Sequence, residues 1–325
     1  MKTLVVDQSL LAEFGDYYRT MNGAISACPV GGTVIVREGT YRESIHYQVG
    51  SPKRVCALYV PRPMTIKAWP GEHPIITYDP KNPPKLQDES LGYTVYFANN
   101  LTGPVTLEGL RIVGSIALEN PSVRNDNNVA VMIPRLLGSV LTIRNCDIGW
   151  AGHCGIKLHE DQTASILIDQ CTIHDCGRFV TDHGIYATST DSNLKTIRDC
   201  TFRNNSGYGI HLYAKPNNWV VDNCVVTHNR TGGILLAGSN NTIRNCSVVN
   251  NKGHANLFIF HYLLNNLTIE RNIFAGRAGI DILVDGMLGL DNVMQKNAWH
   301  TAGTQWIANH QGPSLTAPIG SLGIK

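Results

Sequence analysis

The chain has 325 residues, of which 43% are hydrophobic and 16% charged, and its net charge is +2 with histidine neutral. This composition excludes an intrinsically disordered chain and is sufficient for a sizeable core. The small net charge and the lack of a long basic run argue against nucleic-acid binding, and no apolar run reaches the roughly 18 residues of a membrane span. Nine cysteines are an odd number, so at least one has no intramolecular disulfide partner.

The N-terminal region predicts a short helix. Residues 7–28 carry apolar residues at roughly helical spacing and could form an amphipathic lid. The first residues, MKTLVVDQSLLAEFGD, are too acidic and their apolar run is too short for a signal peptide. Three settings stay open on this ground: the cytoplasm, a phage-derived protein released by lysis, or secretion with the leader removed.

Two short segments alternate along most of the chain. The first recurs five times around a cysteine and once around an asparagine: LTIRNCDI (141–148), ILIDQCTI (166–173), KTIRDCTF (195–202), WVVDNCVV (219–226), NTIRNCSV (241–248) and LTIERNIF (267–274). The second recurs as AVMI (130–133), GIKLH (155–159), GIYAT (184–188), GIHLY (209–213), GILLA (233–237), NLFIF (256–260) and GIDIL (279–283). A period near 24 residues without helices predicts an all-β parallel solenoid, in which each coil stacks on the next.

The repeat also divides the chain. We expect one domain over 1–325, with an N-terminal cap over 1–30, coils over 31–290 and a C-terminal cap or tail over 291–325. The asparagine pairs are expected to form turns and amide ladders. The repeat cysteines are expected to stack inside the coils as free thiols, because stacked residues need not meet disulfide geometry. They are Cys146, Cys171, Cys200, Cys224 and Cys246.

Four stretches resemble known proteins. AISACPVGGTVIVREGTYRESI (24–45), MTIKAWPGEHPIITY (64–78), DHGIY (182–186) and NNSGYGIHLY (204–213) are similar to right-handed parallel β-helix proteins of the pectate-lyase-like superfamily. The resemblance covers nearly the whole chain and implies a single-stranded right-handed parallel β-helix with a short N-terminal helical cap. It implies less about function, because this superfamily includes polysaccharide lyases, polyuronate C5-epimerases, glycoside hydrolases, phage tailspikes and non-catalytic proteins.

Alternation along each Gly-Ile segment predicts which side chains face solvent. The third position reads, coil by coil, Met132, Lys157, Tyr186, His211, Leu235, Phe258 and Asp281, and the fifth reads Pro134, His159, Thr188, Tyr213, Ala237, Phe260 and Leu283. Lys157, Tyr186 and His211 therefore form a polar row on three adjacent coils, with neighbours roughly 5 Å apart.

Loops extend this candidate site. The repeat that follows Cys171 has four extra residues before its Gly-Ile segment, which we expect to form a loop beside the row. The candidate catalytic residues are Tyr186, His211, Lys157 and His183, and the candidate substrate-binding residues are His159, Arg178, Asp182, Tyr213 and Lys215.

The residue types in the row suit one reaction class. Abstraction of the C5 proton of a uronate needs a base, a cation for the carboxylate and, in elimination, an acid for the leaving oxygen. We therefore predict a carbohydrate-active enzyme that acts on an acidic polysaccharide or oligosaccharide, as a β-elimination lyase or a C5-epimerase. Tyr186 or His211 would transfer the proton, and Lys157 or Arg178 would hold the carboxylate.

Two alternatives stay open. A non-catalytic carbohydrate-binding or tailspike- or adhesin-like β-helix would carry the same row as a solvated face. A glycoside hydrolase would need a carboxylate pair, such as Asp161 and Asp182. No cofactor is required, although Ca²⁺ is compatible with Glu160, Asp161 and Asp182. No other metal site is predicted, because CxxC and HExxH are absent. The expected partner is the saccharide, and we expect no binding to nucleic acid or membrane. The oligomeric state stays open between monomer and trimer. His153, His174 and His254 are expected at turns or on the surface.

Overall fold

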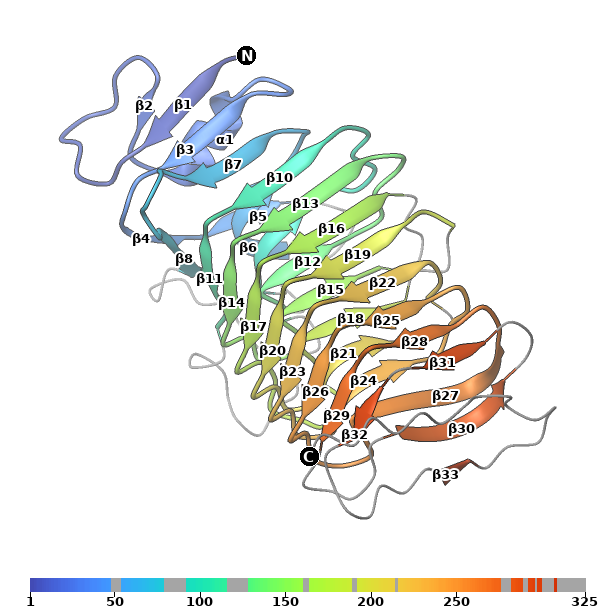
Figure 1. The fold of residues 1–325 in the computed structure, drawn as a ribbon. Helices are drawn as coiled ribbons and strands as arrows, with labels where there is room; N and C mark the ends of the chain where they lie inside the picture. Colours follow the sequence, from blue (N-terminus) through green and yellow to red (C-terminus); the bar gives the residue numbers. More distant parts are fainter. Residues whose placement is uncertain are drawn as a thin grey trace.

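Three long sheets run the length of the molecule, and the chain passes from one to the next in turn (Figure 1). The computed structural model describes residues 1–47, 54–78, 92–115, 128–159, 164–188, 192–213, 216–275, 282–288, 292–295, 297–299 and 307–308. Each sheet is built from equivalent strands of successive coils, which confirms the predicted all-β parallel β-helix. Among the described residues, no helix is long and apolar enough to cross a membrane.

The strand order in the three sheets follows the coils. Sheet A has twelve strands: β2 (Tyr17–Tyr18), β1 (Thr3–Val6), β3 (Thr33–Val36), β7 (Thr65–Ala68), β10 (Val105–Glu108), β13 (Val140–Arg144), β16 (Ser165–Asp169), β19 (Lys195–Arg198), β22 (Trp219–Asp222), β25 (Thr242–Arg244), β28 (Thr268–Glu270) and β31 (Val293–Gln295). Sheet B has ten: β4 (Thr40–Glu43), β8 (Ile75–Tyr78), β11 (Arg111–Val113), β14 (Asp147–Gly149), β17 (Thr172–His174), β20 (Thr201–Arg203), β23 (Val225–Thr227), β26 (Ser247–Val249), β29 (Ile273–Ala275) and β32 (Ala298–Trp299). Sheet C has eleven: β5 (Ile45–Tyr47), β6 (Arg54–Val60), β9 (Gly92–Phe97), β12 (Val131–Ile133), β15 (Ile156–Leu158), β18 (Ile185–Ala187), β21 (Tyr208–Leu212), β24 (Gly232–Leu236), β27 (Leu257–Leu264), β30 (Ile282–Leu288) and β33 (Ile307–Ala308). Neighbouring strands are parallel except β5 and β6, which are antiparallel.

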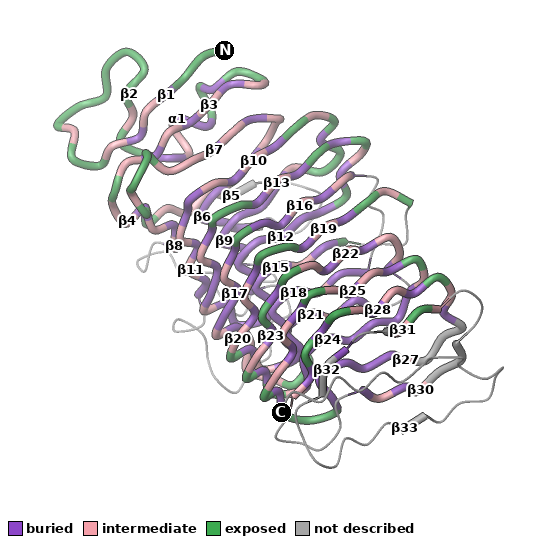
Figure 2. The backbone as a smooth tube through the Cα atoms, in the orientation of Figure 1, coloured by how far each residue is buried: buried purple, intermediate pink, exposed green. Residues whose placement is uncertain are grey.

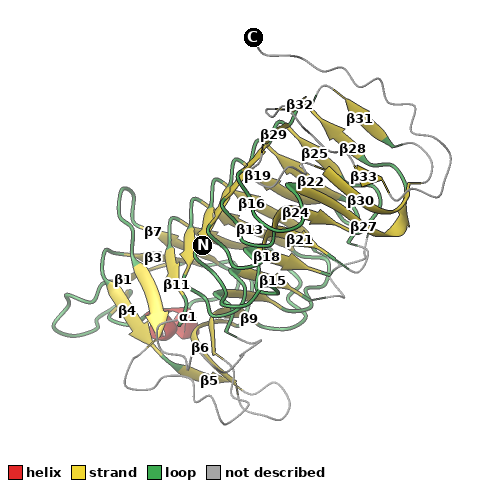
Figure 3. Ribbon diagram, turned by 90° about the horizontal axis from the view of Figure 1, so that it is seen from below, coloured by secondary structure: helices red, strands yellow, loops and turns green. Residues whose placement is uncertain are grey.

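Both ends of the solenoid differ from the sequence prediction. Helix α1 (Met21–Ala27) has seven residues and begins after the N-cap Thr20, so the lid predicted over 7–28 is helical only at its end (Figure 3). The rest of that range contains β2, and β1 already belongs to sheet A. At the other end, β31, β32 and β33 add a strand to each sheet after residue 290, where we predicted the coils to stop. Residues 309–325 of the predicted C-terminal cap lie outside the described residues.

The core consists of apolar ladders inside the coils. One inward column of sheet A consists of Leu107, Ile143, Ile168, Ile197, Val221, Ile243 and Ile269, each buried. Buried segments continue along all three sheets (Figure 2). Each of these side chains stacks on a similar side chain of the neighbouring coil, and the stacking removes it from water. Because the same position of every coil needs a similar residue, the repeat is visible in the sequence.

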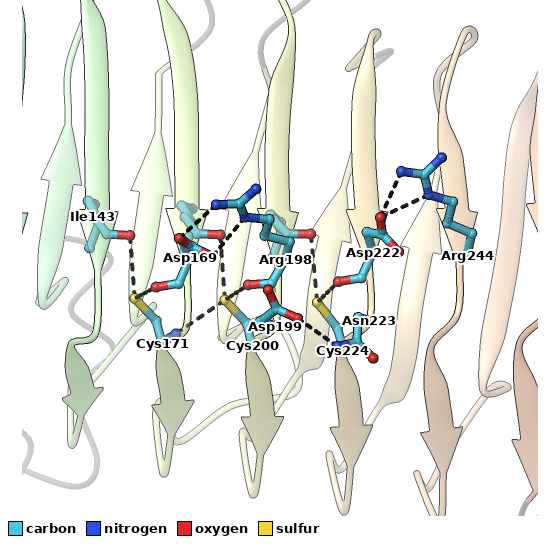
Figure 4. Close-up of polar contacts among 12 residues, drawn as sticks. Ile143, Asp169, Cys171, Arg198, Asp199, Cys200, Asp222, Asn223, Cys224 and Arg244 are labelled. Carbon is cyan, nitrogen blue, oxygen red and sulfur yellow. Dashed lines mark hydrogen bonds and ion pairs between the residues drawn. The ribbon is translucent and has the colours of Figure 1, made fainter.

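The outward column of sheet A alternates in charge along the solenoid. It reads Glu108, Arg144, Asp169, Arg198, Asp222, Arg244 and Glu270. Arg198 Nε donates to Asp169 at 2.8 Å, and Arg244 Nη2 donates to Asp222 at 2.7 Å (Figure 4). Neighbouring coils are thus joined by ion pairs as well as by the backbone ladder.

The cysteine column lies inside the coils, as predicted. Its five members are at most 3% exposed, and each follows a residue in the left-handed conformation at the turn from sheet A to sheet B. In neighbouring coils, the thiols of Cys171, Cys200 and Cys224 contact carbonyl oxygens of their own coil and the preceding one (Figure 4). All nine cysteines of the chain are buried, and each is a thiol outside any disulfide.

Thiol titration tests this arrangement. Protein that is denatured without ever meeting a reductant is expected to show close to nine thiols per chain. The native protein should react slowly, because reaction needs an accessible thiolate and burial raises the pKa of the Cys176 thiol to about 12. A count of one free thiol, corresponding to four disulfides, would contradict the free-thiol ladder.

At the turn after sheet B, one asparagine adopts the backbone conformation of the turn and the next one forms hydrogen bonds inside the coil. Asn204 and Asn250 adopt left-handed φ angles of 57° and 56°, which asparagine tolerates well. The next residues, Asn205 and Asn251, point inward and form an amide ladder with Asn229 of the coil between them. Asn205 Nδ2 donates to Asn229 Oδ1 at 3.0 Å, and Asn229 Nδ2 donates to Asn251 Oδ1 at 2.9 Å. The predicted amide ladder is therefore confirmed across these three coils, although in the middle coil His228, with a φ of 57°, takes the place of the first asparagine.

His174 departs from its predicted place at a turn or on the surface, because it is only 2% exposed. Its Nε2 lies 2.5 Å from an Asp147 oxygen and its Nδ1 lies 2.6 Å from an Asp175 oxygen. Both carboxylates accept a hydrogen bond from the ring, so both ring nitrogens carry a proton and the ring is an imidazolium. Arg111 and Arg203 lie 3.8 and 3.6 Å from these two carboxylates, and the Trp150 ring packs edge-on against the imidazole. Burial alone lowers the pKa of His174, but the hydrogen bonds to the two carboxylates outweigh burial and raise it.

This cluster predicts a pH-dependent stability. His174 has a raised pKa in the folded state, so its contribution is fully present below its ordinary value of 6.5 and is lost as pH rises through the folded pKa. The hydrogen bond from His174 lowers the pKa of Asp147 in the folded state below its ordinary value of 3.8. The stability contributed by this pair is therefore lost at acid pH only as the pH falls from 3.8 through the folded-state pKa of Asp147. The difference in unfolding free energy between wild type and His174→Gln, measured by denaturant titration, should be largest near pH 5 to 6. A difference that grows towards pH 9 would contradict the imidazolium assignment.

Candidate functional site

The predicted row exists on the outer face of sheet C. Strands β15, β18 and β21 are neighbours, and their register places Lys157 opposite Tyr186 and Tyr186 opposite His211. The column continues to Met132 on one side and to Leu235 and Phe258 on the other, as predicted. The next member is Leu283, not Asp281, because β30 pairs two residues further along the chain. Asp281 itself lies outside the described residues.

Glycine before each isoleucine sets the direction of these side chains. A Cβ at Gly184 would lie 3.1 Å from the Phe202 ring, and one at Gly209 would lie 2.6 Å from a Val226 methyl. Both glycines therefore occupy tight corners between sheets B and C where no side chain fits. Ile185 and Ile210, which follow these glycines, point into the core, so the third position of each segment faces outward.

His183 and His211 form a directed hydrogen-bond chain. The backbone N–H of Tyr208 donates to His183 Nδ1 at 3.0 Å, so the proton of this neutral ring is on Nε2. His183 Nε2 lies 2.5 Å from His211 Nδ1 and donates to it. The remaining nitrogen of His211, Nε2, therefore carries the proton of that ring. His183 is only 4% exposed, so it orients His211 from a buried position. We predicted it instead on the surface, in the groove beside the row.

The surroundings of His211 keep it neutral. The rings of Tyr186, Tyr208 and Tyr213 lie 5.1 to 5.5 Å from its ring. Burial lowers the pKa of His211 to about 3. Its Nε2 is buried and has no hydrogen-bond partner among the described residues, which costs about 1–3 kcal/mol. A ligand atom reaches this N–H only when a surrounding side chain shifts.

This assignment predicts a spectroscopic result that needs no substrate. Between pH 5 and pH 8, ¹⁵N-detected imidazole spectra should show His211 as the neutral Nε2–H tautomer, with no titration across that range. The reason is that its folded pKa lies well below pH 5. A midpoint for His211 near pH 6.5 would overturn the assignment.

Lys157 and Tyr186 occupy the more open end of the row, and both are partly exposed. Lys157 Nζ lies 6.0 Å from the Tyr186 ring centre, and that ring stacks on His183 at 5.6 Å. His159, two residues beyond Lys157, is exposed, and Tyr213 is partly buried against Phe260. The row thus presents a cation, a phenol and a neutral imidazole side by side.

Within the predicted loop, Asp182 and His183 turn inward instead of lining the row, whereas Val180 and Thr181 are exposed. Asp182 is fully buried, and its Oδ2 accepts hydrogen bonds from the backbone N–H groups of Arg178 and Phe179 at 2.8 and 2.7 Å. The other oxygen lies 3.7 Å from Nε2 of the buried His153, which was also expected at a turn or the surface. Asp182 holds the loop closed and does not line the row, where we predicted it. Arg178 is partly exposed on this loop.

Three predicted residues cannot be placed. Lys215, Glu160 and Asp161 lie outside the described residues. Within the described ranges, no group of three or more His, Cys, Asp or Glu residues could hold a metal ion. The suggestion of a Ca²⁺ ion beside Asp182 therefore stays a prediction.

Sequence reasoning missed Tyr208 and His254. Tyr208 is 3% exposed and packs with Leu235 and Phe258 on the outer face of sheet C, and its hydroxyl lies 2.5 Å from His254 Nδ1. Alternation counted back from Ile210 places Tyr208 in the core. The tight corner at Gly209 interrupts this alternation, so the count fails there.

A pocket of about 360 Å³ continues the row towards the N-terminus. It is lined by Tyr96, Asn99, Asn100, Met132, Pro134, Arg135 and His159. Met132 pairs with Lys157 and Tyr96 pairs with Met132, so the pocket floor and the row share one column of sheet C. Of the residues that line this pocket, only His159 was predicted to bind substrate.

The three sheets and this outward column define the class of protein. The family model described as "Right handed beta helix region" matches residues 135–293. The chain therefore has the fold of a right-handed parallel β-helix. No curated protein matches the sequence.

Solved structures with this fold differ widely in what they are. The surface adhesin PfbA of Streptococcus pneumoniae aligns with a TM-score of 0.57 and 12% identity, over 90% of this chain and 75% of its own. Pectate lyase Pel9A aligns with 0.55 and 11%, over 95% and 79%. ORF18 of Geobacillus virus E2 aligns with 0.54 and 13%, over 87% and 58%. At these identities the likeness shows the fold alone, so function has to be argued from the site.

Proposed function

We propose that this protein is a carbohydrate-active enzyme that abstracts the C5 proton of an acidic polysaccharide, as a β-elimination lyase or a C5-epimerase. One observation carries the proposal: Lys157, Tyr186 and His211 face outward from adjacent strands, and His211 is neutral and oriented by His183. The three side chains span roughly 10 Å, twice the strand spacing, which is within reach of one sugar residue and its neighbours.

The tautomer of His211 divides the roles. With Nδ1 accepting from His183 and Nε2 protonated, the ring has no free lone pair and acts as a hydrogen-bond donor. It would donate to the carboxylate oxygen on which charge develops when C5 loses its proton. Lys157 would offset the charge of the same carboxylate. Tyr186 is then the group that transfers the proton, and Lys157 Nζ lies 6.0 Å from the centre of its ring.

Both reactions begin with the same step. Tyr186, as phenolate, takes the C5 proton and the C5–H electron pair moves into the carboxylate. In a lyase, the C4–O bond then breaks, a C4=C5 double bond forms, and the proton passes to the leaving oxygen. In an epimerase, a proton returns to the opposite face of C5, which requires a second donor on that face. Lyase and epimerase share these residues, so the row supports the common step.

A non-catalytic carbohydrate-binding or adhesin-like role is the second candidate. Aromatic rings cluster on the outer face of sheet C, and two of them, Tyr186 and Tyr213, are partly exposed and suited to packing against sugars. A hydrolase has less support, because Asp182 of the suggested carboxylate pair is buried and holds the loop.

A substrate panel tests the proposal. The protein is incubated in D₂O with polygalacturonate, alginate, heparosan, chondroitin and hyaluronan. Unsaturated uronate is followed by its ultraviolet absorbance, and NMR follows deuterium at C5. We expect either the absorbance or C5 deuteration with at least one polymer. Binding of a polymer with neither signal would instead support the non-catalytic role.

A further inference from the structure

We propose that the pocket beside Arg135 binds the carboxylate of a second hexuronate residue of the same polymer, next to the residue held by the row. This inference rests on the proposed function for its substrate class and extends it with an anionic subsite. The subsite would consist of Arg135, His159, Asn99 and Asn100 around a floor formed by Tyr96 and Met132.

The charge in this pocket is available for a ligand. Arg135 is exposed, and its guanidinium forms no hydrogen bond or ion pair with any described residue. None of the described lining residues is acidic. A guanidinium matches a carboxylate with two parallel hydrogen bonds, so this geometry favours an anionic sugar over a neutral one. The Arg135 carbonyl accepts from the backbone N–H of Asn100 at 2.7 Å, which ties together the two loops that form the pocket wall.

The other walls suit the rest of a sugar ring. The exposed side chains of Asn99 and Asn100 offer donors and acceptors for hydroxyl groups. The floor is rigid, because the Tyr96 ring stacks on the rings of Tyr93 and Tyr59 at 5.2 and 6.2 Å. Tyr96 and Met132 are only 2% and 6% exposed, so they form a firm apolar base beneath the polar groups of the pocket.

The position of the pocket connects it to the row. Met132 and Tyr96 lie one and two strands before Lys157 in the same column, which corresponds to roughly 5 and 10 Å. His159 lines the pocket and lies two residues from Lys157. A polymer lying along this column would therefore occupy the pocket and the row together. Because Arg135 does not touch the reacting residue, it should affect binding much more than the chemical step.

The test compares binding of defined trisaccharides by calorimetry. The probes are trigalacturonate and trimannuronate, with their methyl esters as uncharged counterparts. Arg135→Ala should weaken binding of the bound acid at least tenfold, the size of effect expected for a lost charge-assisted hydrogen bond, and should leave binding of its ester within twofold. Arg42→Ala, an exposed arginine on β4 in sheet B, is the matched control and should bind like wild type.

The same measurements separate this proposal from the proposed reaction. They are repeated in the Tyr186→Phe background, where turnover cannot alter the ligand. An acid affinity unchanged by Arg135→Ala, an equal loss for acid and ester, or no binding of either acid to wild type would overturn the subsite. Arg135-dependent binding without turnover of any polymer would support the subsite and overturn the proposed catalysis.

Discussion

Replacement of Tyr186 by phenylalanine should lower turnover of the polyuronate substrate by about 10²–10⁴-fold, the usual contribution of a proton-transfer group. The variant removes one hydroxyl from a partly exposed ring, so the melting temperature should stay close to that of wild type. His211→Ala should lose about 10²–10³-fold in kcat, because it removes the donor for the developing negative charge. Initial rates at saturating substrate and thermal unfolding curves measure both effects.

Matched variants away from sheet C control for the chemistry of each substitution. Tyr17→Phe lies on strand β2, where Tyr17 is exposed, and His73→Ala lies in a loop, where the exposed His73 donates its backbone N–H to Glu38. Both should retain wild-type rates. Leu235, although next in the column, is a poor control because it is 4% exposed and its truncation would damage packing. Near wild-type turnover in both Tyr186→Phe and His211→Ala would mean that the row is a solvated face and that the chemistry lies elsewhere.

Loss of one rung of the asparagine ladder should destabilise the fold by at least about 2 kcal/mol. Asn229 accepts from the backbone and side-chain N–H groups of Asn205, and its own amide donates to Phe202 O and Asn251 Oδ1. Asn229→Ala leaves several of these buried groups without partners, and each such group costs about 1–3 kcal/mol. Chemical denaturation monitored by circular dichroism gives the change in unfolding free energy.

Thr201→Ala in the adjacent coil is the reference for this experiment. Its side chain faces outward from β20 and is partly exposed, so the change should stay below about 0.5 kcal/mol. Equal stability of Asn229→Ala and Thr201→Ala would show that water replaces the lost amide and that the ladder adds little to the fold.

The sequence predicted what repeats and missed what occurs once. The coils and the cysteine column depend on residues that recur in register, and so does the Lys157–Tyr186–His211 row. The inward turn of Asp182 depends instead on hydrogen bonds from two backbone N–H groups of one loop, which no periodicity records. Tyr208 was lost because a corner glycine interrupts the alternation used to count faces.

The pocket is a further case of features that occur once. Asn100 and Arg135 belong to different coils and lie 35 residues apart in the chain. They become neighbours only through the pairing of β9 with β12. A sequence pattern within one repeat contains no information about such a pair, so Arg135 could not have been singled out.

The alternating charges on sheet A restrict how the solenoid can gain or lose coils. Excision of one coil, such as the one that carries Asp169, would bring Arg144 against Arg198, and duplication of that coil would set two aspartates side by side. Excision or duplication of two successive coils keeps opposite charges adjacent. Changes in solenoid length are therefore expected to be tolerated best in steps of two coils. During folding, a strand of sheet A that paired with the next strand but one would bring two like charges together, which disfavours this wrong pairing. This holds even though each surface ion pair adds little to the stability of the folded protein.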